Sequence, residues 1–139
     1  MRRDREANGS PSGRRFDPRA LRGHFDRPEV AAVFLFGSAA GGASHGLSDV
    51  DLAYLGISSE AETRVFDVLY EALQRELGEG AFDLVPLRLA PIHLQFAIAT
   101  EGEPLLVRDP ILAEAFGARA IARYLDFKPC RDRYFAATP

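Results

Sequence analysis

The sequence predicts an α/β (α+β) fold, in which a small mixed β-sheet is flanked by helices. With 139 residues, 47% of them hydrophobic, the chain can bury one core and has the length of one domain. Segments with strand-like and helix-like patterns alternate along it, in the order α-β-α-β-α-β-α-(β)-α. The first strand, Val30–Phe36 (VAAVFLF), is apolar throughout, as expected of a central strand covered on both faces.

The first fifteen residues differ in composition from the rest. They hold five arginines and two acidic residues, a net charge of +3, so the remainder carries −6. Because almost none of them is apolar, we expect residues 1–15 to form a disordered basic tail and residues 16–139 a single domain. Asp17 and Pro18 then fit the N-cap and first position of a short helix that ends near Phe25.

Three further strands are expected, at Asp49–Ile57 (DVDLAYLGI), Ala81–Leu87 (AFDLVPL) and Pro104–Val107. Between the first two of these, Ser59 and Glu62 fit a capping box that starts an amphipathic helix. Its predicted C-cap is Gly78, and its core-facing residues are Val65, Leu69, Leu73 and Leu77, with Phe66 and Tyr70 beside them.

Two helices are expected in the C-terminal third, the first from Pro91 to Thr100. Asp109 and Pro110 predict the start of the second, which runs to about Asp126, with Pro129 marking its end. The residues of this last helix expected to face inward are Ile111, Leu112, Ala115, Ile121 and Leu125.

The composition argues against several classes of protein. A net charge of −3 gives no overall basic field, so we expect no direct contact with nucleic acid. Cys130 is the only cysteine, which excludes an internal disulfide and fits a reducing compartment. The longest apolar run is far shorter than the roughly 20 residues of a membrane helix. We therefore expect a soluble, cytoplasmic protein that does not contact a membrane.

A glycine-serine pair follows the first strand. Gly37 and Ser38 are expected to open a short helix or helical turn, where free backbone N–H groups and the helix dipole favour an anion such as phosphate. Glycine allows close approach and serine adds a hydroxyl donor. By itself such a pair is also common in ordinary turns.

Acidic residues lie on the next two predicted strands. Asp49 and Asp51 are two residues apart, so they project from the same side of a strand, with Cα atoms about 6.5–7 Å apart. Such a pair can converge on one divalent cation, or on two, and oxygen ligands suit Mg²⁺. Asp83 can join them if its strand is the neighbour of Asp49–Ile57. Taken singly, each acid could instead be a solvated or turn-capping residue.

Together these residues form the pattern G-S-x10-D-x-D, which resembles that of the DNA polymerase β-like nucleotidyltransferases. The chain most resembles their minimal branch, the MNT (MntA-like) antitoxins that accompany HEPN ribonuclease toxins. The segments that carry this resemblance are LFGS (35–38), SDVDL (48–52), FDLVPL (82–87) and RYLDFKPCRDRY (123–134). The chain departs from the family's usual G-S-x-A-R-G at Gly41, which replaces the arginine.

The resemblance implies transfer of AMP from ATP to a tyrosine hydroxyl of a HEPN toxin, with release of pyrophosphate. It implies two Mg²⁺ ions held by Asp49, Asp51 and Asp83, with Asp83 also able to accept the hydroxyl's proton. Gly37 and Ser38 would bind the terminal phosphates of ATP.

Two other functions fit the same residues. The chain could be a non-catalytic antitoxin that neutralises the toxin by binding, which the replacement at Gly41 favours. It could also be a transferase for a small molecule such as an aminoglycoside, although the chain has no room for an acceptor-binding domain. The basic residues near the C-terminus could reach the nucleotide or the toxin, or form a solvated face: Arg123, Lys128, Arg131 and Arg133.

Overall fold

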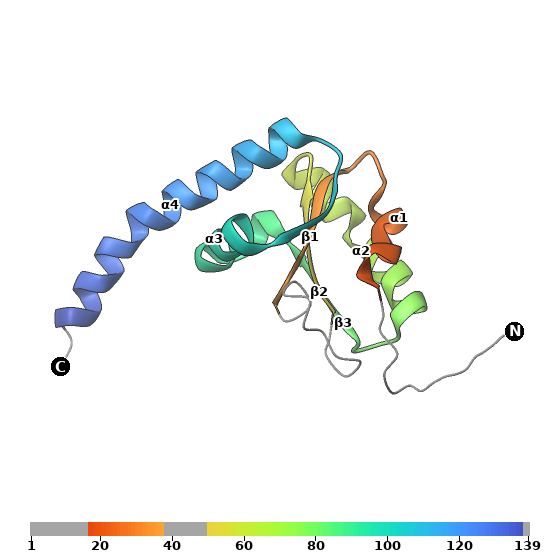
Figure 1. Ribbon diagram of the computed structural model, residues 1–139, viewed down its shortest axis with the longest axis horizontal. Helices are drawn as coiled ribbons and strands as arrows, with labels where there is room; N and C mark the ends of the chain where they lie inside the picture. Colours follow the sequence, from red (N-terminus) through yellow and green to blue (C-terminus); the bar gives the residue numbers. More distant parts are fainter. Residues whose placement is uncertain (1–16, 38–49, 138–139) are drawn as a thin grey trace, which may run out of the picture.

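The computed structural model describes residues 17–37 and 50–137, and the side chains of the last helix up to Pro129 and at Arg133. The prediction of a tail over residues 1–15 lies outside these ranges. A four-stranded sheet has the order β3-β2-β1-β4 (Figure 1). Its strands are β1 (Val30–Phe36), β2 (Val50–Gly56), β3 (Phe82–Pro86) and β4 (Glu103–Val107). β2 runs parallel to β3, whereas β1 is antiparallel to both of its neighbours, so the predicted mixed sheet is confirmed.

Helices cover both faces of this sheet (Figure 1). On one face, α2 (Ser59–Leu77) packs against the strands together with the N-terminal turns η1 (Pro18–Leu21) and α1 (Arg22–Phe25). On the other face lie α3 (Ile92–Glu101) and α4 (Pro110–Ala137). As predicted, β1 is apolar because it is central and covered on both sides.

The helix α2 has the predicted apolar stripe, but its N-cap differs from the prediction. Ser58, not Ser59, is the N-cap, and its Oγ accepts a hydrogen bond of 3.1 Å from Ala61 N. This moves Glu62 one position further into the helix, so the predicted capping box is wrong. Val65, Leu69 and Leu73 are buried as expected, and Gly78 is the C-cap.

The Glu62 side chain does not bond to the N-cap residue but is buried against the end of β2. Its carboxylate accepts hydrogen bonds from Gly56 N at 2.9 Å and from Arg88 N at 3.0 Å, the latter at η3 (Leu87–Leu89). The Arg88 guanidinium in turn donates to Gly56 O. Because a Cβ at Gly56 would lie 2.6 Å from the Glu62 Cα, only glycine fits there. Glu62 thus joins α2, β2 and the turn after β3.

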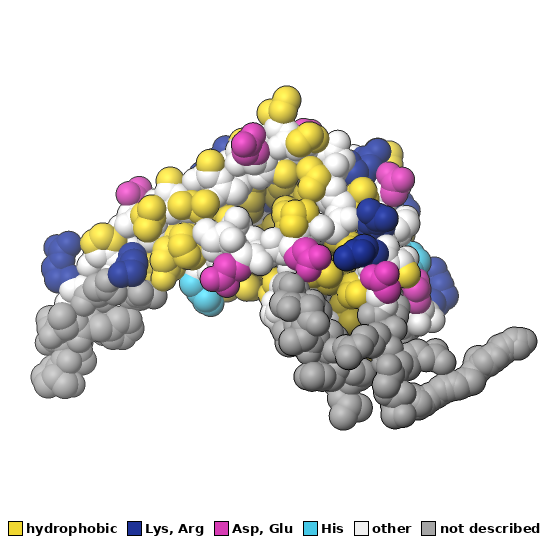
Figure 2. All heavy atoms as spheres, in the orientation of Figure 1, with side chains coloured by type: hydrophobic (Ala, Val, Ile, Leu, Met, Phe, Trp, Pro, Cys, Tyr) yellow, Lys and Arg dark blue, Asp and Glu magenta, His cyan; other side chains and the backbone are white. Residues whose placement is uncertain are grey.

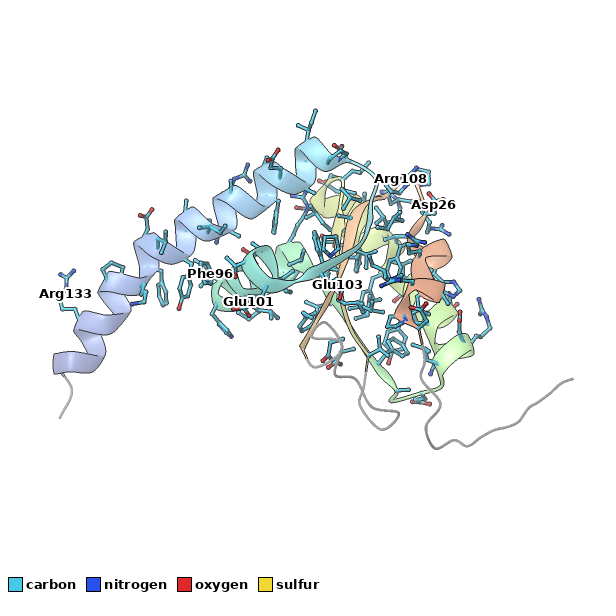
Figure 3. The ribbon with its side chains drawn as sticks, viewed as in Figure 1. Asp26, Phe96, Glu101, Glu103, Arg108 and Arg133 are labelled. Carbon is cyan, nitrogen blue, oxygen red and sulfur yellow. The ribbon has the colours of Figure 1, made fainter. Side chains whose placement is uncertain are left out.

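Arg108, directly after β4, joins this strand to the segment before β1. Its guanidinium donates to Asp26 Oδ1 at 2.9 Å and to the carbonyl of Arg27, just before β1 (Figure 3). Asp109 accepts from Leu112 N at 3.1 Å, which confirms the predicted cap of the last helix. The junction between β4 and α4 is therefore fixed to the start of β1.

The last helix is longer than predicted. It continues through Pro129 to Ala137, a length of 28 residues, so Pro129 lies inside α4 instead of ending it. A proline removes one backbone hydrogen bond, here the one to the Leu125 carbonyl, but the flanking turns keep theirs. None of the helices in the described ranges is both long and apolar enough to cross a membrane.

The predicted inward face of α4 was partly wrong. Ile111 is 82% and Leu125 54% exposed, and Ala115 is exposed as well. The side that packs on the sheet and α3 is instead formed by Leu112, Ala113 and Phe116. In the first turn of α4, Leu112 and Ala113 therefore face the core, whereas Ile111 faces solvent.

Candidate active site

Three strand ends carry the predicted site residues. Phe36 at the end of β1 is the cross-strand neighbour of Asp51 on β2, and Asp51 is the neighbour of Asp83 on β3. Neighbouring strands lie about 4.7–4.9 Å apart, so the side chains of Asp51 and Asp83 leave the same face side by side. The condition set for Asp83, that its strand adjoins β2, is met.

The alternation of side chains shows which face this is. Ala53 and Leu55 share a face with Asp51, and Val85 and Leu87 share one with Asp83. All four belong to the cluster beneath α3 and α4. The two carboxylates therefore lie at one end of the sheet face that carries these helices. Asp83 is exposed and Asp51 half-buried, so a ligand can approach the pair from solvent.

Gly37 lies directly against Asp51. Its φ of 72° is in the left-handed region, and an added Cβ would lie 2.4 Å from Asp51 Oδ2. The backbone conformation favours glycine as the first residue after β1, and a side chain there would have to displace this carboxylate. The sequence predicted a close approach to phosphate at Gly37, and the structure adds a close approach to Asp51.

The other two predicted site residues, Ser38 and Asp49, lie outside the described residues, as does Gly41. The metal-binding, catalytic and nucleotide-binding roles assigned to all five residues remain predictions. Within residues 17–37 and 50–137, no group of three or more His, Cys, Asp or Glu side chains is placed to hold a metal. The third carboxylate that such a group would need is the predicted one, Asp49.

The donor set fits a divalent cation. Like charges directly opposite one another on neighbouring strands destabilise a sheet. A hard cation bound by Asp51 and Asp83 would replace this repulsion with attraction, and carboxylate oxygens are the ligands that Mg²⁺ prefers. Two residues from different strands, fixed by the sheet register, can hold such an ion with little reorganisation.

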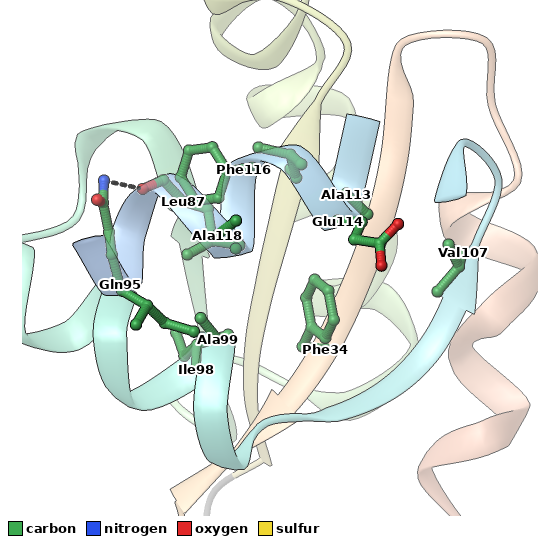
Figure 4. Close-up of a pocket in the computed structure, with 13 residues that line it drawn as sticks. Phe34, Leu87, Gln95, Ile98, Ala99, Val107, Ala113, Glu114, Phe116 and Ala118 are labelled. Carbon is green, nitrogen blue, oxygen red and sulfur yellow. Dashed lines mark hydrogen bonds between the residues drawn. The ribbon is translucent and has the colours of Figure 1, made fainter. Parts of the chain in front are cut away.

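A cavity of about 410 Å³ lies further along the same face, between the sheet, α3 and α4 (Figure 4). Phe34, Leu55 and Leu87 contribute to its walls from the sheet side, and its lining is mostly apolar. Gln95, which is buried, donates from Nε2 to the Leu87 carbonyl at 2.9 Å. Since Leu55 is four residues along β2 from Asp51, and neither acid lines the cavity, it is separate from the candidate site.

Sequence reasoning missed Phe36 as a neighbour of the site. Its half-buried ring lies beside Asp51 on the side of the sheet where α3 packs. Only the strand register could have identified it, because its own sequence context is simply that of an apolar strand. Near the C-terminus, Tyr124 is a packing residue that stacks on Phe96 with ring centroids 4.2 Å apart.

Comparison with known proteins identifies the class of this domain. Residues 24–111 match the family model described as polymerase beta, nucleotidyltransferase, a range that contains Gly37, Asp51 and Asp83. The chain belongs to this nucleotidyltransferase family. A comparison with curated proteins gives no match.

Among solved structures, the chain resembles the MNT antitoxin branch, which confirms the resemblance found in its motifs. It is 28% identical to a chain in a crystal structure of a toxin–antitoxin with AMP-PNP, with a TM-score of 0.64 over 84% of this chain and 90% of that chain. It is 25% identical to a chain in a complex of tri-AMPylated Shewanella oneidensis HEPN toxin with MNT antitoxin, with a TM-score of 0.56 over 84% and 88% of the two chains. A mutant MntA complex, at 22% identity and a TM-score of 0.67 over 87% of this chain and 97% of that chain, shares the fold.

Proposed function

We propose that this chain is an antitoxin that transfers AMP from ATP to a tyrosine hydroxyl of a HEPN ribonuclease toxin, in a Mg²⁺-dependent reaction that neutralises the toxin. The observation that carries the proposal is the register of Asp51 opposite Asp83, with Gly37 against the first of them. Family membership supports nucleotidyl transfer, and the AMPylated toxin in a related complex supports a HEPN protein as acceptor.

In the proposed reaction, the tyrosine oxygen forms a bond to the α-phosphorus of ATP, and the bond from that phosphorus to the bridging oxygen breaks. The products are AMP-tyrosine and pyrophosphate. Bound Mg²⁺ would supply positive charge for the triphosphate. Asp49, Asp51 and Asp83 would hold this ion, and Asp83 would also accept the proton of the tyrosine hydroxyl.

The remaining residues position the nucleotide. The backbone at Gly37, together with the Ser38 hydroxyl, binds the terminal phosphates so that the leaving oxygen lies in line with the attacking one. Little else is required of the protein, because phosphoryl-type transfer depends mainly on positioning and charge stabilisation. The acceptor hydroxyl comes from the partner.

The experiment uses α-³²P-labelled ATP, Mg²⁺, the purified chain and its candidate HEPN toxin. Label on the toxin from the α but not the γ position supports AMP transfer. Asp51→Asn and Asp83→Asn should each lower the rate at least a hundredfold. Asp67→Asn on α2, an exposed aspartate on the opposite face of the sheet from Asp51 and Asp83, is the matched control and should retain activity.

The second candidate, neutralisation by binding alone, predicts a different result. Toxin would be inhibited without label, and Asp51→Asn would inhibit it as well as the wild type. A third result, label on an aminoglycoside but not on the toxin, would assign the chain to small-molecule modification.

A further inference from the structure

The side of α4 that packs on the sheet and α3 continues past the point where these elements end. Ala113 and Phe116 pack against the cluster under α3 and α4, Ala120 is buried, and Tyr124 stacks on Phe96. These positions follow one another in steps of three and four residues, and so does Phe127 after them. Phe127 therefore lies on the packing side of the helix, yet it is 43% exposed.

Phe127 is exposed because α3 extends no further than its N-terminal end beside this residue. Phe96 lies beside Tyr124, while Ala99 lies beside Gly117, so α3 and α4 run antiparallel. α3 begins at Ile92 and reaches no further along α4 than about Phe127. The C-terminal turns of α4 project from the sheet and α3 without a second layer (Figures 1 and 3). We call residues 123–133 the overhang.

The overhang and the turn before it differ in charge from the rest of the chain. Between residues 119 and 133 there are five basic and two acidic residues, a net charge of +3, in a chain whose net charge is −3. Arg119, Arg123 and Arg133 are exposed, and Figure 2 shows basic side chains at this end of the molecule beside hydrophobic ones. An apolar side chain framed by arginines is a common composition for the centre of a protein interface.

We propose that the overhang is a docking surface for the HEPN toxin, through a helical surface on which carboxylates flank an apolar groove. Phe127 is the anchor in the groove, and Arg123 and Arg133 face the carboxylates. The inference rests on the proposed function for the identity of this partner. A second copy of the chain is a poor occupant, because pairing two overhangs would bring together two segments of charge +2.

The test measures binding separately from catalysis. Every variant carries Asp51→Asn and Asp83→Asn, so AMP transfer contributes nothing, and affinity for the HEPN toxin is measured by isothermal titration calorimetry. Phe127→Asp should raise Kd at least tenfold. Arg123→Glu should raise Kd about fivefold and weaken its dependence on salt. Val68→Asp is the control, because Val68 on α2 is 47% exposed and remote from α4, and it should change Kd less than twofold.

Thermal unfolding by circular dichroism checks that each variant is folded, and Phe127→Ala is the milder substitution if Phe127→Asp is not. An unchanged Kd for both Phe127 variants overturns the inference. So does the absence of any complex between the toxin and the parent protein. A homodimer in sedimentation equilibrium that Phe127→Asp dissociates would assign the overhang to a second copy instead. The two proposals can be told apart. If the wild-type chain transfers no label to the toxin but the Phe127 variants raise Kd, the docking surface is supported and AMP transfer is rejected.

Discussion

Gly37 and Asp51 are packed so closely that any side chain at position 37 would have to displace the Asp51 carboxylate: its Cβ would lie 2.4 Å from Asp51 Oδ2. The turn after β1 and the carboxylate on β2 therefore fix each other's position. If Asp51 binds the metal and Gly37 the phosphates, this contact sets the distance between the two ligands. A small change at position 37 should then affect catalysis more than stability.

Gly37→Ala tests this relationship. The methyl group should displace the Asp51 carboxylate and lower the rate of AMP transfer at least tenfold, since catalysis is sensitive to small misplacements. Gly80→Ala is the matched control, because Gly80 also has a positive φ, of 81°, but nothing lies within 4 Å of an added Cβ. Each variant should lose about 1–2 kcal/mol of stability from backbone strain. Equal transfer rates in the two variants would refute a catalytic role for the Gly37–Asp51 contact.

Metal binding should be visible as stabilisation. Opposed carboxylates at Asp51 and Asp83 repel, so Mg²⁺ should raise the melting temperature of the wild-type chain in a concentration-dependent way. Asp51→Asn should remove most of this response. Differential scanning calorimetry in EDTA and in increasing MgCl₂ measures both effects. A melting temperature that does not change with Mg²⁺ concentration would argue against a metal bound by Asp51 and Asp83.

Glu62 should make stability depend on pH. Burial raises the pKa of its carboxyl, and hydrogen bonds from Gly56 N and Arg88 N oppose the rise without cancelling it. The folded protein therefore binds the Glu62 proton more tightly than the unfolded chain, so the stability from this group is greatest below its unfolded pKa. That contribution is lost as the pH rises through the folded pKa.

The measurement compares wild type with Glu62→Gln by urea unfolding from about pH 4, near the ordinary pKa of Glu, to neutrality. The wild type's free energy of unfolding, relative to that of Glu62→Gln, should fall over this range. Glu60→Gln, at an exposed position on the same helix, serves as control. A difference that rises with pH would show that the hydrogen bonds outweigh burial.

Pro129 should weaken the end of α4. It cannot donate the helical hydrogen bond to the Leu125 carbonyl, so the turns around it should open more readily than those near Phe116. Pro129→Ala should slow amide hydrogen exchange over residues 126–137 and leave exchange in α3 unchanged. If exchange near the C-terminus is the same in both proteins, the proline is not what limits the helix there.

The sequence predicted most of the fold because each strand and helix has a strong local pattern. The errors arose where a tertiary partner decided the outcome. From the local sequence, either Ser58 or Ser59 could cap α2. Glu62 does not bond to the cap residue, because its carboxylate accepts hydrogen bonds from the N–H groups of Gly56 and Arg88 instead. The exposed face of α4 depended on where the sheet and α3 end, which local periodicity does not reveal.

The site was predictable in part. The spacing of the acids identified the residues, but whether Asp83 lies near Asp51 depends on strand order, which the sequence left conditional. The structure supplies that order and adds Phe36 as a neighbour. Ser38 and Asp49 lie outside the described residues, so their predicted roles await the experiments above.

The position of β1 has a consequence for incomplete chains. β1 obtains its second neighbour only when β4, some seventy residues later in the sequence, pairs with it. A fragment that stopped before Glu103 would contain every predicted site residue, yet would leave one side of an almost wholly apolar strand as an open edge. Such edges lead to aggregation. Nascent or proteolysed chains should therefore be removed by the cell's quality control, and the proposed AMP transfer would be confined to chains whose sheet has closed.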